Sequence, residues 1–153
     1  MLKLNGFNFN FKVRVRWAEV DPQEIVFNAK YLEYGEITVS EYYRNLGIKL
    51  YNKTSREYFD TALVKATIEF KQSAKVEDIL HIFSRITKIG KTSITQEIEI
   101  YNADTEEHLT SIELIYVDYD SSIGKSKLVP DKMRNLIEDF EKSGSSECFS
   151  QII

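Results

Sequence analysis

An aspartate between a predicted strand and a predicted helix is the residue of this chain best placed to do chemistry. Asp21 follows an alternating apolar segment, and a helical pattern begins shortly after it, near Ala29. The first backbone N–H groups of a helix lack intrahelical acceptors, so they can hold an anion or a developing oxyanion. A carboxylate beside such amides is an arrangement for acyl transfer, in which it acts as nucleophile or general base. Taken alone, Asp21-Pro22 is more often a turn that the Asp side chain stabilises.

The elements that must position Asp21 can be inferred from the periodicity. Residues 7–17 alternate in polarity, which predicts a half-buried strand. Its apolar side carries Phe7, Phe9, Phe11, Val13, Val15 and Trp17. Apolar or small residues then recur at helical spacing, which predicts a helix over about Ala29–Leu46 that ends at Gly47. Gly35 lies on the apolar stripe of this helix, so we expect the helix to approach a sheet closely there.

The remainder of the chain predicts more strands and a short helix. Alternating or apolar segments indicate strands over 62–71, 79–89, 93–101 and 109–119. Short connections between the late strands favour antiparallel pairing, and Pro130 suits the first turn of a C-terminal helix. The expected fold class is α+β, with a five-stranded antiparallel sheet, one long helix and one short helix. One long helix cannot cover both faces of such a sheet, which predicts a homodimer or homotetramer.

Composition limits the classes of protein to consider. The chain has 153 residues and a net charge of −4 at pH 7, which indicates one domain and argues against broad nucleic-acid binding. It contains no apolar run long enough to span a membrane and no secretory signal, so we expect a cytoplasmic protein. We assign residues 1–142 to the domain and 143–153 to a flexible tail, whose Cys148 is predicted to be an unreactive thiol. His81 and His108 lack metal-ligand spacing, so no metal site is predicted.

Several motifs, taken in order, resemble a known family. The run from Val20 to Tyr31, the turn Lys88–Ser93, the pair Val117-Asp118 and Pro130 are similar to the hotdog-fold acyl-CoA thioesterases of the 4-hydroxybenzoyl-CoA thioesterase family. The resemblance covers about Phe7–Phe140. It implies a hotdog fold, in which the sheet wraps around the long helix, and hydrolysis of an acyl-CoA or related thioester. It implies no separate cofactor, since CoA is part of the substrate.

The resemblance also assigns roles to individual residues. Asp21 matches the family's catalytic carboxylate. Asn28 matches the position at the helix start whose backbone amide polarises the thioester carbonyl, and Tyr31 matches a helix tyrosine that is mainly structural. Glu24 stands where the family has a glycine. It either approaches Asp21, raising the pKa of that carboxyl by like-charge repulsion, or faces solvent.

The remaining candidate residues are substrate contacts. Gln23, Glu24, Phe27 and Tyr31 form the expected substrate-binding group around Asp21. Lysines near the late turns are candidates for binding CoA phosphates or an acidic acyl carrier protein, and otherwise are ordinary surface lysines. These lysines are Lys88, Lys91, Lys125 and Lys127.

Two alternatives to an acyl-CoA thioesterase stay open. One is a thioesterase that acts on acyl carrier protein. The other is a non-catalytic hotdog module that binds an acyl chain or another ligand, with Glu24 marking a degenerate site.

Overall fold

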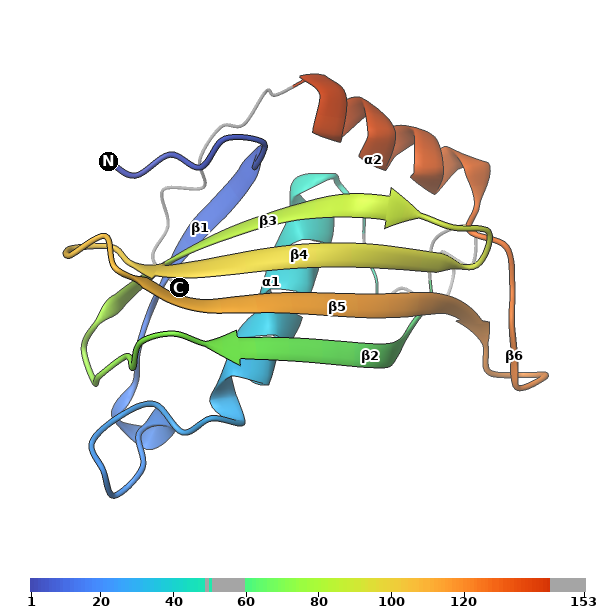
Figure 1. The fold of residues 1–153 in the computed structure, drawn as a ribbon. Coiled ribbons are helices and arrows are strands. Elements are labelled where there is room, and N and C mark those ends of the chain that lie inside the picture. Colours follow the sequence, from blue (N-terminus) through green and yellow to red (C-terminus); the bar gives the residue numbers. More distant parts are fainter. Residues whose placement is uncertain (49, 51–59, 144–153) are drawn as a thin grey trace.

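The computed structural model describes residues 1–48, 50 and 60–143 (Figure 1). Two helices and six strands make up this part of the chain, together with a short 3₁₀ helix over Trp17–Glu19. The elements, in chain order, are β1 (Phe9–Arg14), α1 (Lys30–Asn45), β2 (Thr61–Phe70), β3 (Ile79–Ile89), β4 (Ser93–Asn102), β5 (His108–Asp120), β6 (Lys125–Ser126) and α2 (Asp131–Ser143).

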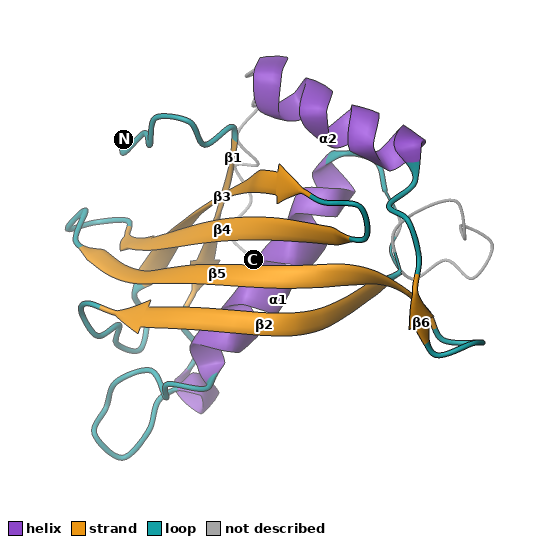
Figure 2. Cartoon of the chain, turned by 45° about the vertical axis from the view of Figure 1, so that its right-hand side comes forward, coloured by secondary structure: helices purple, strands orange, loops and turns teal. Residues whose placement is uncertain are grey.

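One antiparallel sheet dominates the molecule. Its strands lie in the order β1-β3-β4-β5-β2, and the two-residue β6 pairs with the end of β5. The sheet curves around α1, which lies against its inner face, while α2 lies at the β3 side (Figures 1 and 2). This architecture confirms the predicted α+β hotdog fold, in which a sheet wraps around one long helix.

The long helix packs on the sheet where the sequence predicts it. The buried side chains of α1 fall on one stripe, which includes Tyr31, Val39 and Tyr42. A Cβ added at Gly35 would lie 3.3 Å from the Leu114 side chain of β5, so glycine permits the close approach. Gly47 follows the helix with a φ of +75°, a conformation that glycine adopts without strain.

The prediction for Trp17 is wrong. The alternation holds through Val15, which is fully buried, but β1 ends at Arg14 and the chain then turns into the 3₁₀ helix. The period of two is lost there, so the Trp17 side chain is 83% exposed.

The strand β2 lies at one edge of the sheet. Its register with β5 shifts between Leu63 and Lys65, which indicates a β-bulge at Val64. Since β2 has a strand neighbour on one side only within the described chain, most of its residues are exposed. Val64 is 58% exposed and Phe70 is 53% exposed.

The C-terminal helix is held to the sheet by a carboxylate. Glu141 accepts hydrogen bonds from the Tyr42 hydroxyl at 2.5 Å and from the Ile86 backbone N–H at 2.9 Å. The Asn8 side chain donates to the carbonyls of Phe140 and Glu141 at 3.0 and 2.9 Å. The helix includes Ser143, and the rest of the predicted tail, with Cys148, lies outside the described residues. Neither helix in the described ranges is long and apolar enough to cross a membrane.

The Glu141 carboxyl should make stability depend on pH. Burial raises its pKa, although the Tyr42 hydroxyl, the Ile86 N–H and Arg85 oppose the shift. A carboxyl whose pKa is higher in the folded than in the unfolded protein stabilises the fold most at a pH below its unfolded-state pKa, which is about 4.3. This stabilisation is lost as the pH rises through the folded-state pKa. We therefore expect the unfolding free energy of Glu141→Gln to rise relative to that of wild type as the pH increases from about 4 toward neutral. Urea unfolding of both proteins across this range is the measurement, and a difference in unfolding free energy that stays constant with pH would contradict the expectation.

Candidate functional site

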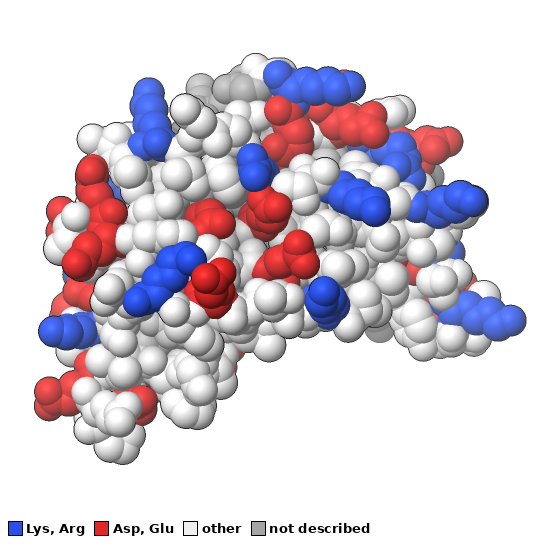
Figure 3. Space-filling view, viewed as in Figure 1, with Lys and Arg blue, Asp and Glu red and all other residues white. Residues whose placement is uncertain are grey.

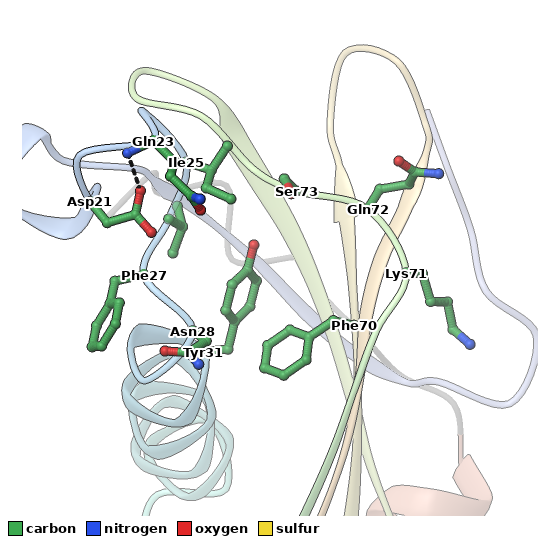
Figure 4. A pocket seen from close by; sticks show the side chains of 11 residues that line it. Asp21, Gln23, Ile25, Phe27, Asn28, Tyr31, Phe70, Lys71, Gln72 and Ser73 are labelled. Carbon is green, nitrogen blue, oxygen red and sulfur yellow. Dashed lines mark hydrogen bonds between the residues drawn. The ribbon is translucent and has the colours of Figure 1, made fainter.

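Asp21 lies in a tight hairpin between β1 and α1. Val20 and Val26 form an isolated bridge, and the Asp21 backbone N–H donates to the Ile25 carbonyl at 2.9 Å. The Asp21 Oδ1 atom accepts the Gln23 backbone N–H at 2.8 Å (Figure 4). The carboxylate therefore does stabilise its own turn. No described residue donates to its second oxygen, which leaves Oδ2 available for chemistry.

Glu24 adopts a left-handed backbone conformation. Its φ is +64°, in the left-handed region, and its N–H closes the turn on the Asp21 carbonyl at 2.9 Å. Glycine reaches this region without the steric cost that a Cβ imposes, which explains the family preference. The Glu24 side chain is exposed and is not among the residues lining the pocket described below.

Replacing Glu24 by glycine should stabilise the fold. A left-handed conformation costs an L-residue roughly 1–2 kcal/mol, and part of the gain is offset because glycine loses more entropy on folding. We expect Glu24→Gly to raise the unfolding free energy by up to about 1 kcal/mol in urea denaturation. Glu24→Ala keeps a Cβ, so its unfolding free energy should equal that of wild type. An equal increase in both variants would show that removal of the negative charge, and not relief of backbone strain, stabilises the fold.

The hairpin is fixed on two sides. On one side, Ile25 bridges to Lys75, Val26 donates its N–H to the Ala74 carbonyl at 2.9 Å, and the Tyr31 hydroxyl accepts the Ala74 N–H at 3.2 Å. On the other side, the Glu19 carboxylate accepts the Tyr34 hydroxyl at 2.8 Å, which ties the preceding 3₁₀ helix to α1. These contacts hold the Asp21 turn in a defined position relative to the helix start.

A cavity of about 500 Å³ opens beside the hairpin (Figure 4). It brings together five predicted site residues: Asp21, Gln23, Phe27, Asn28 and Tyr31. The remaining lining residues are Ile25, Val26, Phe70, Lys71, Gln72 and Ser73. Phe70 is the last residue of β2, and the three residues Lys71, Gln72 and Ser73 follow it. None of these four was predicted, because nothing in the sequence links them to the Asp21 turn, which lies about fifty residues earlier.

Polar and aromatic side chains lie on both sides of the pocket, since Phe27 lies near Asp21 and Lys71 follows Phe70 (Figure 4). In Figure 4, Asp21 and Gln23 lie on one side, Phe70 lies on the other, and Tyr31 stands between them. The rings of Tyr31 and Phe70 meet edge to face at 5.3 Å between centroids. Burial raises the pKa of the Tyr31 hydroxyl, so this group stays neutral. The Tyr31 side chain therefore lines the pocket without adding a charge to it.

The helix start has one backbone amide without an acceptor among the described residues. The Asn28 side chain accepts the Ala29 N–H at 2.9 Å, and the N–H groups of Lys30 and Tyr31 donate to the carbonyls of Phe27 and Asn28. Among the described residues, none accepts the Asn28 N–H itself. Asn28 lines the pocket with Asp21, and a backbone N–H without an internal acceptor is a group that can bind an oxyanion.

The four predicted lysines lie elsewhere in the chain. Thr61 and Ser93 pair with the far end of β5, whereas Phe70 pairs with its beginning. The lysines are carried at that far end by the β3–β4 turn and the region of β6, so one chain does not gather them with the pocket (Figure 1). Lys127 lies 3.4 Å from the buried Asp118 carboxylate. Lys71, which was not predicted, lines the pocket, and its Nζ lies 3.0 Å from Glu69.

The two histidines lie outside the pocket. His81 is buried on β3, accompanied by Asn10 at 2.9 Å, and burial lowers its pKa to about 4. His108 lies beside Glu99, with 2.6 Å between Nε2 and Oε2. Within the described ranges no three His, Cys, Asp or Glu side chains are grouped to hold a metal. On the face seen in Figure 3, acidic and basic side chains are interspersed.

Comparison of the sequence with known proteins identifies its relatives. The acyl-CoA thioesterase YbgC of Haemophilus influenzae is 26% identical over 93 residues, which are 61% of this chain and 67% of that protein. The acyl-CoA thioester hydrolase YbgC of Escherichia coli O6:H1 is 24% identical over 139 residues, which are 91% of this chain and 100% of that protein.

Solved structures share the fold. A 1,4-dihydroxy-2-naphthoyl-CoA thioesterase from Synechocystis superposes with a TM-score of 0.78 at 22% identity, covering 86% of this chain and 96% of that one. A Thermus thermophilus thioesterase complexed with coenzyme A and Zn gives 0.75 at 19% identity, covering 90% and 97%. A family model described as the thioesterase-like superfamily matches residues 15–137, which include the whole pocket. The chain therefore belongs to the thioesterase-like superfamily.

Proposed function

We propose that the protein is an acyl-CoA thioesterase in which Asp21 is the catalytic carboxylate. The observation that carries the proposal is that Asp21 and Asn28 line one pocket, where no described residue donates to the Asp21 Oδ2 atom or accepts the Asn28 N–H. The names of the similar bacterial proteins support the reaction and the class of substrate.

The pocket residues support two routes for the hydrolysis. In the first, Asp21 takes a proton from water as the water oxygen attacks the thioester carbonyl. In the second, Oδ2 attacks the carbonyl directly, CoA leaves as the thiolate, and water then hydrolyses the resulting anhydride. In both routes the carbonyl oxygen becomes negatively charged, and the Asn28 N–H stabilises it. The products are a free acid and the CoA thiol.

Other pocket residues would hold the substrate. Phe27, Tyr31 and Phe70 provide apolar surface for the acyl group, and Gln23 can orient the attacking water. Lys71 at the pocket can meet a CoA phosphate. An acyl carrier protein presents the same thioester, so it is the alternative partner for this chemistry.

The test is the release of free thiol from short, long and aromatic acyl-CoAs by wild type and Asp21→Asn. Turnover that the variant loses, with an unchanged circular dichroism spectrum, supports the proposal. If the enzyme hydrolyses acylated carrier protein and no acyl-CoA, its substrate is a carrier-protein thioester, and the proposed role of Asp21 still holds. Ligand binding by the wild type without turnover of either substrate would show a non-catalytic binding module, and turnover that survives in Asp21→Asn would show that another group is the base or nucleophile.

A further inference from the structure

Glu19 joins the base of the Asp21 hairpin to the long helix. Its side-chain Oε2 atom accepts the Arg16 backbone N–H at 2.8 Å and the Tyr34 hydroxyl at 2.8 Å. Its backbone carbonyl accepts the Phe27 N–H at 2.9 Å. One residue therefore contacts the segment before the hairpin, the segment after it and the helix α1.

We propose that Glu19 is a positioning residue for the thioester hydrolysis, which sets both the place of Asp21 and the direction of the Asn28 N–H. This inference rests on the proposed function. Glu19 is not among the residues that line the pocket, so it acts through the groups that it holds and not by touching the substrate.

The stem of the hairpin connects Glu19 with Asp21. The Glu19 carbonyl accepts the Phe27 N–H at the base of the stem, and the next pair along the stem is the Val20–Val26 bridge. Asp21 follows Val20 directly. Antiparallel pairing fixes the positions of the paired residues relative to one another, so the place of Asp21 depends on where the base of the stem is held.

The peptide between Phe27 and Asn28 connects Glu19 with the proposed oxyanion donor. Glu19 holds the Phe27 N–H, and the Phe27 carbonyl accepts the Lys30 N–H at 2.9 Å in the first turn of α1. In a planar trans peptide the N–H points opposite to the C=O. Because the Phe27 carbonyl points toward α1, the Asn28 N–H points away from the first turn of the helix, where it can meet an oxyanion.

Tyr34 gives Glu19 a fixed point of attachment on the helix. The Tyr34 side chain is 1% exposed, and a buried hydroxyl costs free energy unless it keeps a hydrogen-bond partner. Burial and the neighbouring Glu19 carboxylate raise the pKa of the Tyr34 hydroxyl, so the hydroxyl stays protonated and donates to Glu19. The Tyr34 ring also meets the Tyr31 ring edge to face at 5.9 Å between centroids, which connects this attachment to a side chain that lines the pocket.

Two conservative substitutions separate the position of Glu19 from its charge. Glu19→Gln keeps the length and an oxygen acceptor but removes the charge, whereas Glu19→Asp keeps the charge and is one methylene shorter. We expect Glu19→Gln to keep kcat within about twofold of wild type, and Glu19→Asp to lower kcat about tenfold while KM stays close to wild type. The reverse order would show that Glu19 acts through its charge, and it would overturn the positioning role. Equal kcat values for the two variants would overturn it as well.

Tyr34→Phe removes the contact with the helix alone, so it should lower kcat about as far as Glu19→Asp. Tyr42→Phe is the matched control, because it also removes a buried tyrosine hydroxyl from a glutamate, Glu141, but away from the pocket. This control should leave kcat unchanged, although it lowers the unfolding free energy. An equal loss of kcat in both phenylalanine variants would show a general effect of stability and would overturn the role of Glu19.

Hydrogen exchange of backbone amides tests the attachment without any substrate. The N–H groups of Asp21 and Phe27 are hydrogen-bonded within the hairpin, so they exchange slowly only while the hairpin stays closed. We expect Glu19→Asp and Tyr34→Phe to speed exchange at these two amides about tenfold relative to the amides of β3, and Tyr42→Phe to cause no such local increase.

The exchange and activity measurements distinguish the attachment from the proposed function. Exchange at the Asp21 and Phe27 amides that is the same in all variants would overturn the attachment by Glu19. Wild type that hydrolyses no thioester would reject the proposed function and with it the catalytic consequence. The attachment of the hairpin would then still be confirmed by faster exchange in Glu19→Asp and Tyr34→Phe.

Discussion

Asp21→Asn is expected to lower kcat for acyl-CoA hydrolysis by about 10²–10⁴-fold while KM and thermal stability stay close to wild type. The amide oxygen of Asn can still accept the Gln23 N–H that Asp21 Oδ1 accepts at 2.8 Å, so the turn persists. What is lost is the negative charge on the second oxygen, which the proposed chemistry requires as base or nucleophile. Steady-state kinetics together with a melting curve measure both properties.

Asp21→Ala provides the comparison for the turn. Alanine removes the charge and also the acceptor of the Gln23 N–H, so it should lose as much kcat as asparagine and additionally about 1 kcal/mol of stability. If Asp21→Asn kept wild-type kcat while Asp21→Ala lost it, Asp21 would matter for the shape of the loop, and the catalytic role would be refuted.

Tyr42→Ala is expected to lower the unfolding free energy by about 3–5 kcal/mol. The Tyr42 side chain is fully buried, and its ring meets Phe9 and Phe140 edge to face at 5.5 and 5.6 Å. Truncation would leave a cavity where α1, β1 and α2 meet and would remove one hydrogen-bond donor from Glu141. Urea unfolding at neutral pH measures the loss, which is a large share of the stability of a typical domain.

Tyr42→Phe separates packing from hydrogen bonding at this site. The ring contacts remain, and Glu141 keeps the Ile86 N–H, so the cost should be limited to about 1–3 kcal/mol for one hydrogen bond to a buried carboxyl. Equal losses for phenylalanine and alanine would show that the hydroxyl, and not the ring, holds the three elements together.

The long helix and its packing could be predicted from local patterns. The apolar stripe of α1 and the glycine at position 35 depend on neighbours within two helical turns, so a single sequence contains the necessary information. The ends of the helix also matched, since α1 covers Lys30–Asn45 and Gly47 has the positive φ of a helix terminator.

Edges and ends of strands could not be predicted in the same way. Trp17 continues the alternation of β1 in the sequence but is exposed, because the 3₁₀ helix interrupts the strand. The β-bulge at Val64 likewise depends on pairing with β5, a strand distant in the sequence. Periodicity reports which side chains alternate, whereas bulges and edges depend on which strands are neighbours.

The residues of the candidate site that are close in sequence could be predicted, whereas those brought in by long-range contacts could not. Asp21, Asn28 and Tyr31 lie within one continuous motif, and the structure brings them to one pocket. Phe70 and Lys71 join them only because the segment after β2 crosses the Asp21 hairpin at Lys75. Such long-range contacts leave no local signature, and the same holds for the separation of the predicted lysines from the pocket within one chain.

The open edge of β2 also bears on how the protein behaves when it is handled. Among the described residues no strand pairs with the outer edge of β2, which carries the exposed apolar side chains of Leu63, Val64 and Phe70. Such an edge is a template on which unrelated chains can aggregate into intermolecular sheets. Lys65 and Glu69 are the charges that this edge presents, and charged residues of this kind act as gatekeepers against growth of such sheets. Loss of those two charges would therefore lower solubility before it affected the fold.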